Sequence, residues 1–302
     1  MANKIAVIWD FDKTLVNGYM QDPIFEEYNY DSQTFWKEVN LLPGKYEKEQ
    51  GVKVNKDTIY LNLFIKYAKE GKFEGLNNEK LKSFGSKLKF YDGVTYILKK
   101  VKEIVEEDNS FKEYDIKVEN YIISTGMKKI IEGSPLYELV EGIWGCELIE
   151  EEIDGKKIIS ELGYTIDNTS KTRAIFEINK GIPQNPELDV NASVPENLRR
   201  VPFENMIYIA DGPSDIPAFS VIKKNHGSTF AIYPKGDNKA FKQVEQMRED
   251  GRIDMYAEAD YSENTTACMW ITNKVLQIAK RIKESEKEKF NHSVSQGPSH
   301  IN

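Results

Sequence analysis

The chain has 302 residues, of which 40% are hydrophobic, so it is long enough to bury the core of one large domain or of two modest ones. Its 49 acidic side chains outnumber the 41 basic ones, and the resulting charge of −8 argues against a nucleic-acid-binding surface, which is usually basic. With two cysteines and three histidines, a disulfide scaffold or a Cys/His zinc site is excluded, and any bound metal is expected to have oxygen ligands, as Mg²⁺ prefers.

The first predicted element is a strand, an apolar run over residues 5–9 that ends at two carboxylates, Asp10 and Asp12. In extended backbone these side chains project from the same side. Like charges this close stay ionised at low cost only when a metal ion or a proton separates them. The pair therefore predicts metal-assisted acid–base or nucleophilic chemistry, and the alternative is a plain polar turn after a strand.

Residues 19–88 read as a set of helices and predict a small helical domain inserted after the first strand. The breaks between its helices are expected at Pro43-Gly44, Gly51, Gly71 and Gly75. The aromatic side chains of this segment are expected to form its core rather than to line a pocket, and they are Tyr19, Phe25, Tyr28, Phe35, Trp36 and Tyr60.

A second buried strand is predicted over residues 117–124, ending in Ser124-Thr125-Gly126 at the start of another helix. A hairpin is expected next, with strands 144–150 and 156–160 around an Asp-Gly turn. Lys171 then stands at the start of a short helix that ends near Gly181.

The last third of the chain repeats the strand-then-acid pattern. Residues 182–202 contain four prolines and predict an irregular connection, after which the strand 206–210 runs directly into Asp211 and Asp215. Further elements are expected in the order strand 229–233, helix 238–249 and helix 265–283.

Strands that alternate with helices predict an α/β fold with a three-layer, Rossmann-like parallel sheet core. The predicted organisation is a core over 1–18, the inserted helical domain over 19–88, the continued core over 89–285 and a polar tail over 286–302 that is expected to be disordered. No apolar run reaches membrane-spanning length. A cytoplasmic protein without membrane or nucleic-acid partners is therefore expected, and the oligomeric state is left open.

Four segments occur in an order that resembles the motifs of the haloacid dehalogenase superfamily of phosphohydrolases. They are Asp10-Phe11-Asp12-Lys13-Thr14, Ile122-Ile123-Ser124, Lys171, and Asp211-Gly212-Pro213-Ser214-Asp215. The resemblance is closest to the phosphoserine phosphatase-like branch, which carries a helical cap between the first and second motifs. One departure is Ala210, where many relatives have glycine.

The resemblance implies that Asp10 attacks phosphorus to form an aspartyl-phosphate and that Asp12 acts as general acid and base. Lys171 would be catalytic and would neutralise phosphate charge, and Ser124 with the amides of Thr125 and Gly126 would bind phosphate oxygens.

The resemblance also implies a Mg²⁺ cofactor. Its ligands would be Asp10, the backbone carbonyl of Asp12, and Asp211, while Asp215 would order the water ligands of the metal or hold the catalytic lysine.

The expected function is that of a Mg²⁺-dependent phosphatase acting on a small phosphorylated metabolite, with a small-molecule phosphate ester as partner. Two alternatives stay open, a phosphotransferase or mutase that uses the same intermediate, and a non-catalytic binding or regulatory protein. Phosphoserine is not assigned as the substrate because no arginine precedes Arg173, which leaves Lys37, Lys45 or Lys53 as candidates to read a carboxylate.

Overall fold

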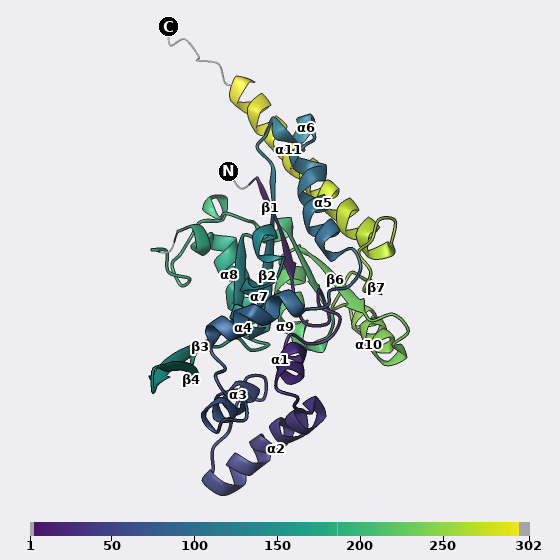
Figure 1. Ribbon diagram of the computed structural model, residues 1–302. Coiled ribbons are helices and arrows are strands. Elements are labelled where there is room, and N and C mark those ends of the chain that lie inside the picture. Colours follow the sequence, from purple (N-terminus) through teal and green to yellow (C-terminus); the bar gives the residue numbers. More distant parts are fainter. Residues whose placement is uncertain (1–2, 186, 296–302) are drawn as a thin grey trace.

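The fold centres on a seven-stranded sheet with the strand order β4-β3-β2-β1-β5-β6-β7 (Figure 1). The computed structural model describes residues 3–185 and 187–295. Neighbouring strands are parallel except for the antiparallel pair β3–β4. The strands are β1 Lys4–Trp9, β2 Lys117–Met127, β3 Gly142–Ile153, β4 Lys156–Tyr164, β5 Met206–Ala210, β6 Ser228–Tyr233 and β7 Met255–Glu258.

Helices cover both faces of the sheet and complete the predicted three-layer α/β fold (Figure 1). Helices α5 and α11 pack on one face, and α8, α9 and α10 pack on the other. The helices are α1 Asp22–Glu27, α2 Ser32–Gln50, α3 Ile59–Lys69, α4 Asn78–Phe84, α5 Val94–Glu106, α6 Asn109–Lys112, α7 Lys128–Glu132, α8 Lys171–Lys180, α9 Ile216–Lys224, α10 Asn238–Glu249 and α11 Thr266–Ser295. Among the described residues, no helix combines the length and apolarity needed to span a membrane.

Strand β1 is the centre of this arrangement because its side chains are buried on both faces of the sheet. Ile5, Val7 and Trp9 join the core cluster under α5 and α11, whereas Ala6 and Ile8 join the cluster under α8 and α9. The period of two residues explains this division, since successive side chains of a strand point to opposite faces. A strand of this kind reads as a continuous apolar run, as the sequence predicted.

Helices α1–α4 form the segment between β1 and β2, and they lie together beyond one end of the sheet (Figure 1). Phe25, Phe35 and Phe64 pack in the interior of this segment with ring centroids 4.6–5.8 Å apart. The expected aromatic core is thus present, although Tyr19 is 40% exposed. The domain boundaries at residues 19 and 88 stay a prediction.

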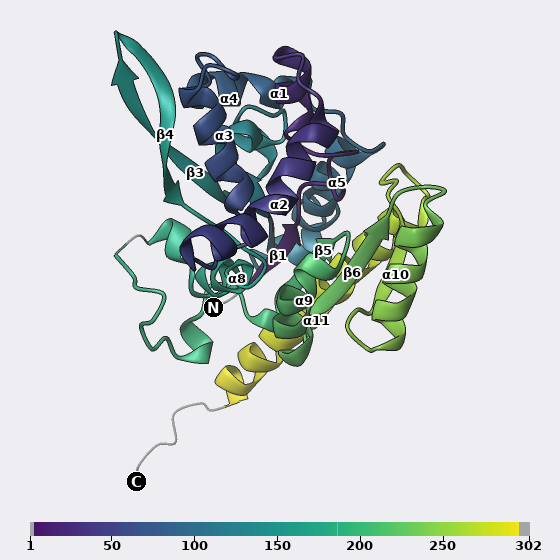
Figure 2. The ribbon, with the colours of Figure 1, turned by 90° about the horizontal axis from the view of Figure 1, so that it is seen from below.

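The hairpin β3–β4 extends from the sheet to these inserted helices (Figure 2). The Ile159 amide donates to the Leu76 carbonyl at 3.0 Å, and the Asn78 side-chain amide donates to the Leu148 carbonyl at 3.0 Å. Both strands are longer than the sequence predicted, because packing against α3 and α4 supports residues that had no strand signal of their own.

Two predictions about helix ends are wrong. Helix α2 continues through Pro43 to Gln50, because Val39 and Leu42 before the proline and Tyr46 after it all pack against the same core. Helix α11 continues to Ser295, so the predicted disordered tail is helical as far as that residue, and residues 296–302 lie outside the described part of the chain. Glutamate and lysine favour helix in this extension, and Lys289 pairs with Glu286 one turn away at 2.8 Å.

Candidate active site

The register of the three central strands places the predicted catalytic acids at one edge of the sheet. Trp9 at the end of β1 lies opposite Ile122 of β2 and Ile209 of β5. The Asp10 amide continues this pairing by donating to the Ile209 carbonyl at 2.9 Å. Asp10 therefore leaves the sheet beside the end of β5, where Asp211 follows.

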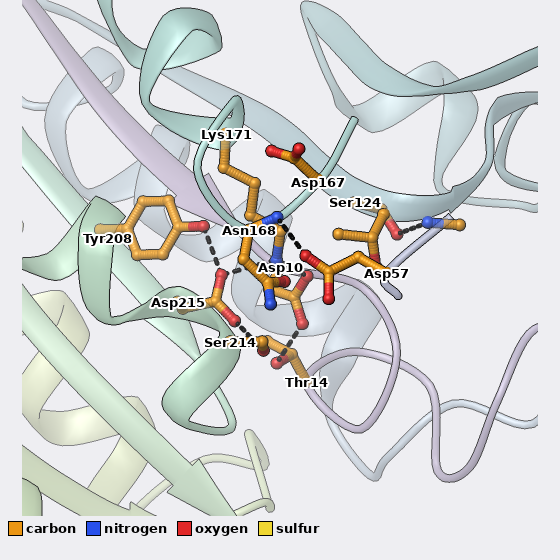
Figure 3. Close-up of polar contacts among 12 residues, drawn as sticks. Asp10, Thr14, Asp57, Ser124, Asp167, Asn168, Lys171, Tyr208, Ser214 and Asp215 are labelled. Atoms are coloured by element: carbon orange, nitrogen blue, oxygen red, sulfur yellow. Dashed lines mark hydrogen bonds and ion pairs between the residues drawn. The ribbon is translucent and has the colours of Figure 1, made fainter. Parts of the chain in front are cut away.

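Lys171 joins two of the acids, as Figure 3 shows. Its Nζ atom lies 2.7 Å from Oδ1 of Asp10 and 2.6 Å from Oδ1 of Asp215. The lysine is only 1% exposed, and burial by itself lowers its pKa, but the two carboxylates outweigh burial and raise the pKa above its ordinary value. The amine is therefore a buried cation held between Asp10 and Asp215.

The three acids Asp10, Asp211 and Asp215 place one carboxylate oxygen each within 4.8 Å of one another. Burial raises the pKa of Asp10 to about 6, against the opposing effect of Lys171. Burial, together with Asp10 and Asp215, raises the pKa of Asp211 to about 7. Ionisation of Asp10 and Asp211 is thus unfavourable with one buried amine as the counter-ion, and a divalent cation with oxygen ligands fits this donor set.

Asp12 lies outside this cluster and has a different environment. Its Oδ1 atom accepts a hydrogen bond from the Met20 amide at 2.8 Å. Burial and the neighbouring Asp10 raise its pKa well above the ordinary value. A carboxyl group with a raised pKa holds its proton more readily than an ordinary one, which suits a general acid.

The second predicted motif is folded differently from the expectation. Strand β2 continues through Ser124, Thr125 and Gly126 to Met127, so Thr125 and Gly126 lie in the strand and not at a helix start, and the helix predicted after this segment, α7, begins at Lys128. The strand is prolonged because Met127 pairs with Cys146 of β3. The Ser124 hydroxyl, 1% exposed, accepts from the Gly126 amide at 3.0 Å. The roles predicted for these residues in phosphate binding stay predictions.

Three further side chains that the sequence reasoning did not place in the site contact these acids. The Tyr208 hydroxyl donates to Oδ1 of Asp215 at 2.6 Å, and the Ser214 hydroxyl donates to Oδ2 of Asp215 at 2.8 Å. The Thr14 hydroxyl donates to Oδ2 of Asp10 at 3.2 Å. Ser214 and Thr14 belong to the motifs found in the sequence, but Tyr208 lies in an apolar strand, and no sequence pattern marked it as a site residue.

The turn before Lys171 connects the site to the inserted helices. Asp167 accepts from the Ser170 amide at 2.6 Å and from the Asn55 side-chain amide at 2.8 Å. Asp57 accepts from the Asn168 amide at 3.2 Å, a contact that Figure 3 shows in the same view as Lys171 and Asp10. The segment that precedes α3 is therefore docked on the turn that leads into Lys171.

Asp10 is only 6% exposed, whereas Asp12 and Asp211 are half-buried. A cavity of about 620 Å³ lies where the chain enters and leaves the inserted helices, and Tyr19, Asp22, Glu26 and Lys87 are among its lining residues. None of the site's acids Asp10, Asp12, Asp211 and Asp215 lines it. This cavity is therefore separate from the cluster of acids.

Comparisons with known proteins relate both the chain and its fold to others. No protein-family model matches the chain. An uncharacterized protein of Borreliella burgdorferi is 37% identical over 287 residues, covering 90% of this chain and 97% of that protein. A haloacid dehalogenase (HAD) family hydrolase from Salmonella enterica serovar Typhi has a TM-score of 0.52 at 15% identity, covering 84% of this chain and 67% of that chain. A phosphoserine phosphatase structure with a phospho-aspartyl intermediate analogue has a TM-score of 0.44 at 19% identity, covering 84% and 93%.

Proposed function

Because the chain belongs to the same family as the Borreliella burgdorferi protein and has the fold of HAD-type hydrolases, we propose that it is a Mg²⁺-dependent phosphatase. Its substrate is a small phosphate monoester, and its nucleophile is Asp10. The observation that carries the proposal is the contact of Lys171 with both Asp10 and Asp215, inside a cluster of acids whose oxygens lie within 4.8 Å.

The metal would be held by the carboxylates of Asp10 and Asp211 and by the backbone carbonyl of Asp12, with Asp215 beside them. When bound, Mg²⁺ supplies positive charge that neutralises phosphate oxygens and so permits an anionic nucleophile to approach. The acids present fit this role, because Asp10, Asp211 and Asp215 place carboxylate oxygens within 4.8 Å of one another, while the buried amine of Lys171 pairs with Asp10 and Asp215.

The protein's own groups then divide the work. Asp10 attacks phosphorus and forms an aspartyl-phosphate while the bond to the leaving oxygen breaks, and Asp12 gives its proton to that oxygen. A water molecule later attacks the aspartyl-phosphate after losing a proton to Asp12, which regenerates Asp10 and releases phosphate. Lys171 stabilises the charge on the transferred group, and Asp215, held by Tyr208 and Ser214, keeps the lysine in position.

Turnover of p-nitrophenyl phosphate tests the proposal. We expect hydrolysis in the presence of Mg²⁺, loss of hydrolysis on addition of EDTA, and recovery when Mg²⁺ is restored. Asp10→Asn is expected to abolish turnover because an amide is a poor nucleophile, while Asp154→Asn, at the exposed hairpin turn, is the matched control and should keep wild-type activity.

A folded wild-type protein without activity toward any phosphate ester would contradict the proposal and favour a binding role. Full activity in Asp10→Asn would also contradict it, since the phosphoryl group would then have no acceptor at this site.

A further inference from the structure

Gln21, the residue before α1, carries a buried polar atom that the structure leaves without a partner. Its side chain is 3% exposed, and its Oε1 atom has no hydrogen-bond partner among the described residues. Burial removes an amide oxygen from water, so such an atom is normally given a donor in return. Gln21 makes no side-chain hydrogen bond that caps α1, so the helix does not explain its burial.

The contacts of its neighbours place the Gln21 amide on the Asp12 side of the site. Met20, the preceding residue, donates its backbone amide to Asp12 at 2.8 Å. The Gln21 side chain lies beside the Tyr60 hydroxyl, whose pKa it lowers against the larger effect of burial, and this hydroxyl donates to the Thr125 carbonyl at 2.9 Å. The Gln21 amide therefore lies between Asp12 and the end of β2, where Asp12 would protonate the leaving oxygen of a substrate.

The same network determines which atom of the amide is free. A tyrosine hydroxyl has one proton, and that of Tyr60 is used at the Thr125 carbonyl. Gln21 lowers the pKa of Tyr60, as a donor group near a phenol oxygen does, so the NH₂ group of the amide is the end that faces Tyr60, and Oε1 is left as an unpaired acceptor. An unpaired acceptor calls for a donor, and a hydroxyl or ammonium group on the leaving alcohol would supply it.

Charge around this position favours such a donor over a carboxylate. Asp12 is the acid on this side of the site, and Asp57, from the loop before α3, adds a further acid at the turn before Lys171. The basic side chains of the inserted helices are engaged elsewhere or exposed. Lys66 pairs with Glu38, Lys69 with Glu151 and Lys80 with Glu27, while Lys37, Lys45 and Lys53, the predicted carboxylate readers, are exposed. Lys13, near Asp12 and Asp211, has its amine 4.4 Å from the centroid of the Tyr19 ring.

We propose that Gln21 is a specificity-determining residue that accepts a hydrogen bond from the leaving group of the substrate. The preferred substrates are then phosphate monoesters of alcohols that carry a further hydroxyl or ammonium group close to the ester oxygen, and phosphorylated carboxylic acids are disfavoured. This inference rests on the proposed phosphatase function and goes beyond it by naming the substrate class.

Four small esters of similar size test the substrate class with the wild-type protein and Mg²⁺. They are propyl phosphate without a donor, then glycerol 1-phosphate with hydroxyls and phosphoethanolamine with an ammonium group as the two donor-bearing esters, and 3-phosphoglycerate, in which a carboxylate accompanies the hydroxyl. We expect kcat/KM for at least one of the two donor-bearing esters to exceed that for propyl phosphate by about 10-fold or more, because a buried acceptor is otherwise left unpaired. Which of the two is preferred decides between a hydroxyl and an ammonium group.

The ratio of kcat/KM values between the preferred ester and propyl phosphate is the readout for Gln21. In Gln21→Leu this ratio should fall to within about 2-fold of one, because leucine offers no acceptor. Gln21→Glu keeps an acceptor at this position and should keep the preference. Gln33→Leu, which alters an exposed glutamine on α2, is the matched control and should leave both the ratio and the absolute activity unchanged.

Retention of the wild-type ratio in Gln21→Leu would overturn the inference, and so would a wild-type preference for propyl phosphate or 3-phosphoglycerate. If Gln21→Leu does not fold, the wild-type ratios and those of Gln21→Glu decide the matter. Turnover of p-nitrophenyl phosphate keeps the two proposals apart. If the protein hydrolyses p-nitrophenyl phosphate but shows no preference for donor-bearing esters, only the proposed role of Gln21 is contradicted. If it hydrolyses no ester at all, the proposed phosphatase function is contradicted as well.

Discussion

Asp10 and Asp12 come from one motif, yet their surroundings give them different properties. Asp10 contacts a lysine and a threonine hydroxyl, whereas Asp12 accepts a hydrogen bond from a backbone amide and, among the described residues, has no cation in hydrogen-bond contact. At Asp10 the lysine opposes the rise in pKa that burial causes, whereas at Asp12 the Met20 amide opposes it. The proposed division between nucleophile and proton donor follows from these contacts.

Asp12→Asn is expected to lower turnover by about 10²- to 10⁴-fold, because asparagine neither gives nor takes the proton. The loss should be larger for propyl phosphate than for p-nitrophenyl phosphate, since p-nitrophenolate leaves without protonation. Steady-state kinetics with both esters measure this difference. Equal losses, or turnover close to that of the wild type, would show that Asp12 does not act as the acid.

The raised pKa of Asp211 predicts how the stability of the metal-free protein depends on pH. Its pKa is raised from 3.8 to about 7 in the folded chain, so the folded state binds a proton more tightly than the unfolded state does. The destabilisation by its charge is complete above pH 7 and fades as the pH falls from 7 toward 4. In EDTA, Asp211→Asn should therefore raise Tm most at pH 8, and the gain should shrink by pH 5.

Thermal unfolding of wild type and variant across this pH range measures that difference. Addition of Mg²⁺ at pH 8 should reverse the order, because a ligand that binds only the folded state stabilises it and the variant has lost one ligand. A pH-independent difference in EDTA would mean that Asp211 does not titrate as described.

The turn of the hairpin β3–β4 is determined by its local sequence, whereas the length of its two strands depends on tertiary packing. Its turn residues Asp154 and Gly155 have φ angles of 50° and 74°, which a two-residue hairpin turn requires and which glycine adopts readily. The strands beyond this turn gain length from their contacts with α3 and α4.

Gly155→Ala is expected to destabilise the protein by about 1 kcal/mol, because alanine is strained at positive φ. Gly44→Ala is the matched control, since Gly44 lies inside α2 with open space around it. This second change should stabilise the protein by about 0.5–1 kcal/mol. Urea unfolding of both variants measures the two signs, and a loss of stability in Gly44→Ala would contradict the helical account of this position.

At the scale of the whole molecule, Trp9 joins the sheet to the layer that covers it. Its indole NH donates to Oδ1 of Asn120 at 3.1 Å, and its ring meets Tyr261 edge-on with centroids 5.7 Å apart. The Tyr261 hydroxyl in turn donates to the Thr14 carbonyl at 2.7 Å, in the loop that follows Asp10 and Asp12. Trp9 and Tyr261 therefore link the core of the sheet, through direct contacts, to the loop that contains Thr14.

Trp9→Phe is expected to lower the free energy of unfolding by about 1–3 kcal/mol, because it leaves the buried Asn120 oxygen without its donor. Trp270→Phe, which alters a partly buried ring stacked on Phe230 of β6, should cost less. Urea denaturation measures the free energy of unfolding of both variants. An equal or larger loss of stability in Trp270→Phe would show that the indole hydrogen bond of Trp9 contributes little.

Much of the architecture follows from sequence patterns that act over short distances. The apolar runs of β1 and β5, each followed by acids, predicted two central strands and the edge at which the acids meet, because parallel strands place their carboxyl ends together. Helix α10 and the Asp-Gly turn were likewise predictable, since local periodicity and turn chemistry determine them.

Features that depend on distant contacts could be decided only by the tertiary structure. The passage of α2 through Pro43, the prolongation of β2 through Ser124 and the length of α11 each depend on neighbours remote in sequence. The same holds for Tyr208 at Asp215 and for the unpaired oxygen of Gln21. The sequence by itself determined which chemical groups stand at the ends of strands, since a strand signal is local. Which hydrogen bonds those groups make, and which buried atom lacks one, was decided by packing between segments far apart in the chain.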